Sequence, residues 1–236
     1  MIDIHIHILP GLDDGPATLE ESLAMARKTV QSGVDTVIAT PHIANGLYLN
    51  NKNNIIEAVK IVSQHLEKHG IPLTVLPGSE VRLSPDVIDG VDNNEIITLN
   101  DSGHYLLLEL PDQLPVAIAI NFINRLSKKG ITAIIAHAER NISIQRDIKM
   151  LKEMHKAGAL CQVTGGSLLG AFGGAAKKCC ITIIKERLAD FIASDAHSAQ
   201  VRPPNLDLAF RKACSLAGNL EAERLMITGP SMILNS

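Results

Sequence analysis

Residues 1–16 read MIDIHIHILPGLDDGP, an apolar run that carries two histidines and is followed by two aspartates. An apolar run of this length bounded by Pro and Gly predicts a buried β-strand over residues 2–8. His5 and His7 occupy alternate positions, so in a strand both side chains point to the same face. They are either hydrogen-bonded core residues or half of a metal site, and the rest of the chain decides between these readings.

Similar apolar runs recur along the chain and alternate with amphipathic segments. Strands are predicted at residues 2–8, 34–40, 71–81, 105–111, 131–140, 159–167 and 189–198. Helices are predicted at residues 18–33, 53–70, 115–130, 143–158 and 174–188, with one or two more between 206 and 227. This alternation predicts an α/β fold with a parallel sheet and helices outside it. Seven strands favour a closed barrel over an open sheet.

Composition narrows the class of protein. The 236 residues are 46% hydrophobic, and no linker or repeat divides them, so we expect one domain spanning residues 1–236. A net charge of −3 and an aromatic content of 3% argue against nucleic-acid binding. The chain shows neither a signal-peptide pattern nor an apolar run long enough for membrane insertion, and its four cysteines are scattered. We therefore expect a cytoplasmic protein.

Polar residues cluster where the predicted strands end, which is where parallel barrels carry their chemistry. Besides His5 and His7, these residues are His42, Glu80, Glu109, His137, Asp195 and His197, with Asp13 and Asp14 in the first loop. A single histidine or glutamate at the end of a strand is usually a structural residue. Histidines and carboxylates at the ends of many successive strands are better explained by a shared function. Imidazole and carboxylate are the ligands that Zn, Mn and Fe(II) prefer, so the set predicts a metal site. Spacing alone does not choose between Asp13 and Asp14.

Two further features bear on phosphate chemistry. Arg140 and Arg202 follow proposed ligands closely. Each is either a surface arginine or a phosphate contact, for which the planar guanidinium group suits bidentate binding. A cysteine-based phosphatase needs a Cys followed by five residues and an Arg, and none of the four cysteines meets this spacing. The glycine-rich stretch GGSLLGAFGG at residues 165–174 lacks the spacing of a phosphate-binding loop, although its glycines would let the backbone approach a ligand closely.

The motifs DIHIHIL, GLDDGP, TPH, GSEVRL, LLLELP, AHAER and SDAH resemble, in order and spacing, the PHP (polymerase and histidinol phosphatase) superfamily. Within it, the chain is most similar to the bacterial manganese-dependent protein-tyrosine phosphatases of capsule and exopolysaccharide operons. The similarity runs from Ile2 to about Pro204. It implies a distorted TIM-like (β/α)7 barrel of the PHP type.

The resemblance also implies the site. Three divalent ions are expected, with Mn as the first choice and Fe or Zn as alternatives. Their implied ligands are His5, His7, Glu80 and Asp195 for the first ion, Glu80, Glu109 and His137 for the second, and Asp14, His42 and His197 for the third. A hydroxide formed from metal-bound water would attack phosphotyrosine, with Arg140 and Arg202 binding the phosphate. The implied partner is a membrane-linked bacterial tyrosine kinase that regulates polysaccharide export.

Two other functions compete with this one. The same metals could hydrolyse a small phosphate ester, or the chain could be a non-catalytic PHP module that binds a partner. The complete set of ligands argues against the second alternative, because a binding module has no physical reason to keep every metal-binding group. The sequence leaves the oligomeric state open.

Overall fold

A computed structural model describes residues 1–43 and 46–236 of the chain. Its strands pair only in parallel within the described residues, and they form the wall of a barrel. They are β1 (Ile2–Ile6), β2 (Thr36–Ala39), β3 (His42–Ile43), β4 (Thr74–Pro77), β5 (Glu80–Arg82), β6 (Tyr105–Glu109), β7 (Thr132–Ile135), β8 (Leu160–Thr164) and β9 (Phe191–Ala193).

The barrel wall consists of two sheets, in the orders β1-β2-β4 and β3-β5-β6-β7-β8-β9. The predicted strand 34–40 contains β2, and β3 follows directly beyond Pro41, a residue without a backbone N–H. The third predicted strand supplies β4 and β5, separated at Gly78, where a Cβ would lie 2.7 Å from Ile38 Cγ2. Each of these two strands therefore passes from one sheet into the other.

The barrel closes between β1 and the segment that follows β9. Ile6 pairs with Ala196 in parallel, the amide of His7 donates to the carbonyl of Ala196 at 2.9 Å, and the amide of Asp195 donates to the carbonyl of His5 at 2.8 Å. With β2/β3 and β4/β5 each counted as one interrupted strand, the described residues form a closed barrel of seven parallel strands. The predicted distorted TIM-like (β/α)7 barrel is confirmed.

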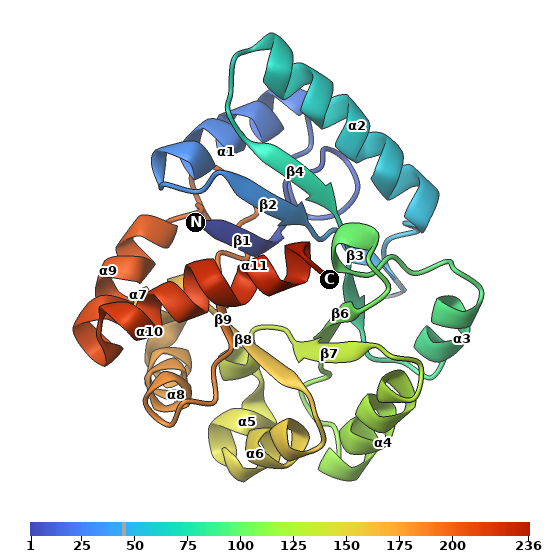
Figure 1. Cartoon of the computed structure of the whole chain (residues 1–236), viewed down its shortest axis with the longest axis vertical. Coiled ribbons are helices and arrows are strands. Elements are labelled where there is room, and N and C mark those ends of the chain that lie inside the picture. The colour runs from blue at the N-terminus through green and yellow to red at the C-terminus, as the bar shows by residue number, and fades with distance from the viewer. Residues whose placement is uncertain (44–45) are drawn as a thin grey trace.

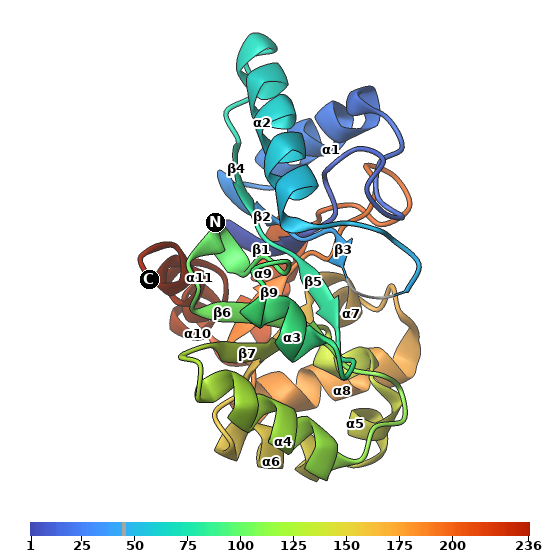
Figure 2. The ribbon, with the colours of Figure 1, turned by 90° about the vertical axis from the view of Figure 1, so that its right-hand side faces the viewer.

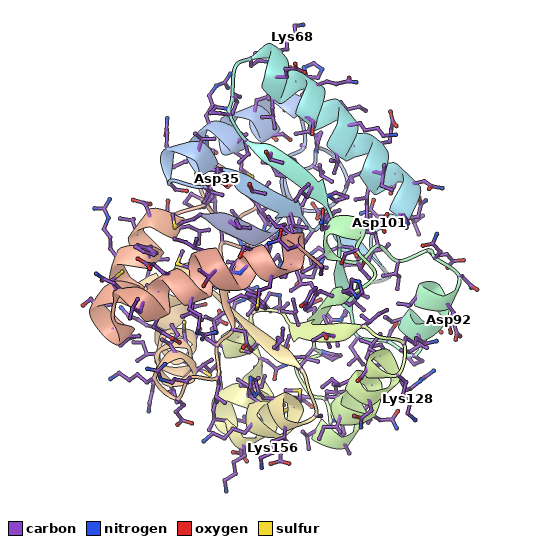
Figure 3. All side chains as sticks on the ribbon, viewed as in Figure 1. Asp35, Lys68, Asp92, Asp101, Lys128 and Lys156 are labelled. Atoms are coloured by element: carbon purple, nitrogen blue, oxygen red, sulfur yellow. The ribbon has the colours of Figure 1, made fainter. Side chains whose placement is uncertain are left out.

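Helices surround this barrel in Figure 1. They are α1 (Leu19–Gln31), α2 (Lys52–Lys68), α3 (Val87–Asp92), α4 (Val116–Ser127), α5 (Ile142–Arg146), α6 (Lys149–Lys156), α7 (Gly165–Leu169), α8 (Gly173–Lys185), α9 (Leu206–Ala217), α10 (Asn219–Glu223) and α11 (Gly229–Leu234), with short 3₁₀ turns η1 (Leu99–Asp101) and η2 (Ala138–Arg140) and the π-helical turn η3 (Arg224–Thr228). Thr18 caps α1 in a capping box with Glu21. Figure 3 shows Lys68, Lys128 and Lys156 projecting outward near the C-terminal ends of α2, α4 and α6, where a cation complements the helix dipole.

One end of the barrel is closed by apolar side chains. Ile4, Ile38, Leu107 and Phe191 form an inner cluster together with Ile233 of α11. Figure 1 shows α11 crossing in front of β1, and Figure 2 shows it on the side of the molecule where the N-terminus lies. Because this end is plugged, the polar residues at the carboxyl ends of the strands face the opposite, open mouth.

Several local predictions were wrong. The predicted helix 143–158 is two helices, α5 and α6, because Asp147 is extended (φ −144°, ψ 101°) and its side chain accepts from the amide of Lys149 at 3.0 Å. Residues 165–169 end the predicted strand 159–167 early and form α7. The short helix α3 was not predicted, and the helical tail continues to Leu234 rather than Ile227.

Candidate metal centre

A bulge in β1 brings both histidines of the opening stretch to the barrel axis. The register of β1 on β2 shifts between Asp3 and Ile6, so β1 holds one extra residue there. Ile4 therefore belongs to the inner apolar cluster although the next residue, His5, also turns its ring inward. The side chains of His5 and His7 are both 0% exposed.

Four donor atoms from three parts of the chain converge at the centre. His5 Nε2 lies 3.3 Å from His7 Nε2, from Glu80 Oε2 and from Asp195 Oδ1, and His7 Nε2 lies 3.3 Å and 3.5 Å from the same two oxygens. Donors that share one ion through bonds of about 2.0–2.2 Å are separated by distances of this size. These four residues form a group that fits a metal ion.

Two more donor groups adjoin the first. One joins His7, Asp14, His42 and His197, with Asp14 Oδ1 at 3.2 Å from His197 Nε2 and 3.5 Å from His42 Nε2. The other joins His42, Glu80 and Glu109, with His42 Nδ1 at 3.2 Å from Glu80 Oε2. His7, His42 and Glu80 each belong to two groups, so the three groups form one continuous cluster.

His137 reaches this cluster through Glu80. Its Nε2 lies 2.7 Å from Glu80 Oε1, and its backbone is left-handed (φ 30°) where β7 gives way to η2. The donor group that contains Glu80 and Glu109 is completed by His42 and does not include His137. All nine residues that the sequence singled out as ligands thus meet at the barrel mouth, with a different neighbour around Glu109 than the resemblance implied.

Hydrogen bonds outside the donor groups orient the rings of His5, His7 and His197. His7 Nδ1 donates to Asp13 Oδ2 at 2.6 Å, His5 Nδ1 donates to Gln162 Oε1 at 3.1 Å, and His197 Nδ1 donates to the carbonyl of Asp195 at 3.1 Å. Each arrangement leaves Nε2 free to face the centre, as carboxylate–histidine–metal arrangements require. Of the two aspartates that the sequence left as alternatives, Asp14 lies in a donor group, and Asp13 contacts His7 on the side of the ring away from the cluster.

Gln162 was missed by the sequence reasoning. Its Oε1 also accepts from the backbone amide of His137 at 2.8 Å, so it supports two histidines. The sequence did contain a sign of this role: Gln162 is a polar residue within the apolar run of residues 159–163, and a buried polar side chain needs hydrogen-bond partners.

Charges in the cluster suit cation binding. Burial lowers the pKa of His42 and of His197, and burial together with the nearby Arg140 lowers the pKa of His137 to about 4. Burial alone would raise the pKa of Glu80, but the adjacent His5 and His137 hold it well below its usual range. Burial alone would lower the pKa of His5 and of His7, but Glu80 and Asp195 raise that of His5, and Asp13 raises that of His7. Metals bind neutral imidazoles and ionised carboxylates, so an ion at the first group would displace protons from these two rings.

A cavity of about 240 Å³ opens over the cluster. Its lining residues include Asp14, His42, Glu80, Glu109, His137, Asp195 and His197 together with Arg140 and Arg202. Arg202 Nη2 donates to Asp195 Oδ2 at 2.6 Å, and Arg140 pairs with the same oxygen. The two predicted arginines therefore lie beside the donors, and the site combines places for divalent cations with two cations that suit a phosphoryl group.

Comparison with known proteins agrees with this geometry. The family model described as "Capsular polysaccharide synthesis, CpsB/CapC" matches residues 1–235. The tyrosine-protein phosphatase YwqE of Bacillus subtilis is 40% identical over 203 residues, covering 86% of this chain and 79% of YwqE. The putative tyrosine-protein phosphatase CapC of Staphylococcus aureus is 36% identical over 239 residues, covering all of this chain and 92% of CapC.

A solved structure extends the comparison to three dimensions. It comes from work on YwqE of B. subtilis and CpsB of Streptococcus pneumoniae, described there as unique metal-dependent tyrosine phosphatases. It superposes with a TM-score of 0.95 at 36% identity and covers all of this chain and 94% of its own.

Proposed function

Because the chain belongs to the CpsB/CapC family of capsular polysaccharide synthesis, we propose that it is a metal-dependent protein-tyrosine phosphatase. The observation that carries the proposal is the cluster around Glu80, in which three groups of metal donors share a cavity with Arg140 and Arg202. A phosphate monoester carries its negative charge on the oxygens that such a site would bind.

The residues fit divalent ions by the chemistry of their donor atoms. We assign His5, His7, Glu80 and Asp195 to one ion, Glu80, Glu109 and His137 to a second, and Asp14, His42 and His197 to a third, with Mn²⁺ as the first choice. The adjoining donor groups support three ions, and the mixture of imidazole and carboxylate donors supports Mn, Fe or Zn. Divalent ions bound there would lower the pKa of a bound water and offset the charge of the phosphoryl oxygens.

Arg140 and Arg202 are assigned to the phosphoryl group. Their side chains are 21% and 30% exposed, so their N–H groups are partly open to the cavity while their stems are held by the protein. The leaving group of phosphotyrosine is a phenolate, whose conjugate acid has a pKa of about 10. It therefore departs without the protonation that an alkoxide requires, and we assign no general acid.

The cysteines do not support thiol chemistry. Cys161, Cys179 and Cys180 are buried, and burial raises the pKa of each thiol, to about 11 for Cys179. A nucleophilic cysteine needs a lowered pKa, so the metal cluster is the better source of the nucleophile.

We assign the substrate to a tyrosine-phosphorylated protein of capsule or exopolysaccharide synthesis, with a bacterial tyrosine kinase as the first candidate. The family description supports the pathway, and the names of the relatives support phosphotyrosine. Within the residues that the structure describes, no helix has the length and apolarity to cross a membrane. We place the phosphatase in the cytoplasm as one domain over residues 1–236.

Matched phosphotyrosine and phosphoserine peptides test the proposal. Phosphate release would be measured with Mn²⁺ and again with EDTA. Release from phosphotyrosine alone, abolished by EDTA, is the expected result. Equal release from both peptides would contradict the assigned specificity, and no release from either would contradict phosphatase function.

A further inference from the structure

Phe172 lies against both arginines of the proposed phosphate site. The centroid of its ring is 4.7 Å from Arg140 Cζ and 5.6 Å from Arg202 Cζ. Both distances fall within the range of about 6 Å over which a cation is attracted to an aromatic face. The arginines come from separate segments, η2 and the loop after His197, and they meet on this ring and on Asp195.

The glycine-rich stretch at residues 165–174 explains how the ring reaches this position. Phe172 directly precedes α8, and its ring packs against the start of α7. A Cβ on Gly166 would lie 2.9 Å from Phe172 Cε2, closer than packed carbon atoms approach. Glycine at position 166 therefore makes room for the ring beneath the two guanidinium groups.

We propose that Phe172 is a positioning residue for phosphate binding. Its ring holds the planes of the Arg140 and Arg202 guanidinium groups so that their N–H edges converge on the phosphoryl group. The identity of that group rests on the proposed function. A guanidinium stacks through its face and donates through its edge, so the two contacts are compatible. Without the ring, two long side chains would regain rotamer freedom that phosphate binding would have to remove again.

The charges around the ring support this role. The positive charges of Arg140 and Arg202 repel each other. The carboxylate of Asp195, which both arginines contact, offsets this repulsion. Asp195 is also a proposed metal ligand, so a bound ion would share its charge with the two arginines. Among the described residues, the buried Nε of each arginine has no hydrogen-bond partner. The negatively polarised face of Phe172 is a further source of attraction for both cations.

Binding of inorganic phosphate to the metal-loaded protein tests the proposal without turnover. Calorimetry would compare the parent with Phe172→Leu, Phe172→Tyr, Gly166→Ala and, as a matched control, Phe210→Leu, which removes a half-buried ring from α9. We expect Phe172→Leu to weaken phosphate binding about 5- to 30-fold and to raise the KM for a phosphotyrosine peptide by a similar factor, with unchanged metal content. Phe172→Tyr should bind like the parent, Gly166→Ala should weaken binding by displacing the ring, and Phe210→Leu should have no effect.

Several results would overturn the inference. One is a Phe172→Leu protein that binds phosphate within about 2-fold of the parent. Another is a Phe172→Leu protein that loses metal and thermal stability together, since the ring would then be structural. Absence of phosphate binding in the parent would overturn it as well. A protein that binds phosphate through Phe172 but hydrolyses no phosphotyrosine would support this inference and contradict the proposed function.

Discussion

Asp13 Oδ2 lies 2.6 Å from His7 Nδ1, on the side of the ring that faces away from the donor cluster. The same carboxylate accepts from the amides of Gly15 and His42, at 2.9 Å and 3.1 Å. Asp13 thus joins the first loop to β3 and sets the orientation of a histidine that belongs to two donor groups. Its side chain acts on the site through His7, without being placed among the donors.

We predict that Asp13→Ala lowers the affinity for divalent metal about 10- to 100-fold, because His7 would lose the partner that fixes its tautomer and orientation. Metal titration against a fluorescent chelator would measure this. Asp86→Asn is the control, since Asp86 is exposed and makes no capping hydrogen bond. Unchanged affinity in Asp13→Ala would contradict the role assigned to the carboxylate.

His42→Ala should abolish most of the activity while leaving the protein folded. His42 contributes to two of the three donor groups, so its loss removes ligands from both, whereas the His5, His7, Glu80 and Asp195 group stays complete. We expect the rate to fall by at least about 100-fold, with a lower metal content per chain by elemental analysis. His65→Ala, on α2 and outside the donor groups, should keep both. Full activity in His42→Ala would favour a site that does not use this part of the cluster.

The fold was predictable because the barrel signals are local. Each strand is an apolar run, and every predicted strand except 159–167 ends near a histidine or a carboxylate, so runs such as residues 2–8, 105–111 and 189–198 can be recognised one at a time. The interruption of the second and third strands at Pro41 and Gly78 depends on how the two sheets meet, so it cannot be predicted from the sequence of either segment alone. The break at Asp147 was hidden for a related reason, since the apolar period continues through it.

The site was predictable in its residue types and less so in its arrangement. Asp13 and Asp14 are adjacent in the loop, and only the position of His7 separates their roles. Gln162 and Phe172 gain their roles from residues far away in the chain, namely His5 for Gln162 and Arg140 and Arg202 for Phe172. Relationships of this kind arise only when the barrel closes.

Removal of metal should lower stability as well as activity. Ions that bind the folded chain stabilise it by mass action, by about 2.7 kcal/mol per site when free metal exceeds Kd 100-fold. Without ions, the carboxylates and imidazoles of the buried cluster are packed against one another at 3.2–3.5 Å, with the two arginines beside Asp195 as neighbouring cations. We therefore expect EDTA to lower Tm in thermal unfolding followed by circular dichroism, and Mn²⁺ in excess to restore it. A Tm that does not respond to EDTA would contradict metal binding at this cluster.

Thiol alkylation should leave the activity unchanged. Cys161, Cys179 and Cys180 are buried, and burial raises the pKa of each thiol, so very little thiolate exists near neutral pH. Phosphotyrosine hydrolysis would be measured before and after treatment with iodoacetamide, with mass spectrometry to count the modified thiols. Loss of activity in step with modification of one of these three thiols would point to a catalytic cysteine and contradict the metal mechanism.

The ion pair between Glu221 and Arg224, outside the donor cluster, should make the free energy of unfolding depend on pH in the acidic range. Glu221 of α10 accepts from Arg224 at 2.8 Å and 3.1 Å, and Arg224 also donates to the carbonyl of Ala189, just before β9. The hydrogen bonds from Arg224 lower the pKa of Glu221. A carboxyl group whose pKa is lowered by folding stabilises the fold above its ordinary pKa of about 4.5, and that contribution is lost as pH falls through the lower, folded value.

We therefore expect Glu221→Gln to reduce the free energy of unfolding by about 1–2 kcal/mol at pH 7, because the charge-assisted hydrogen bonds are weakened. The difference from the parent should shrink as the pH falls below 4, where Glu221 of the parent also becomes protonated. Urea unfolding of both proteins across this range would measure it, with Glu223→Gln, an exposed neighbour on the same helix, as the control. A difference that stays constant with pH would mean that Glu221 acts through packing, and that its charge contributes nothing to holding α10 against the start of β9.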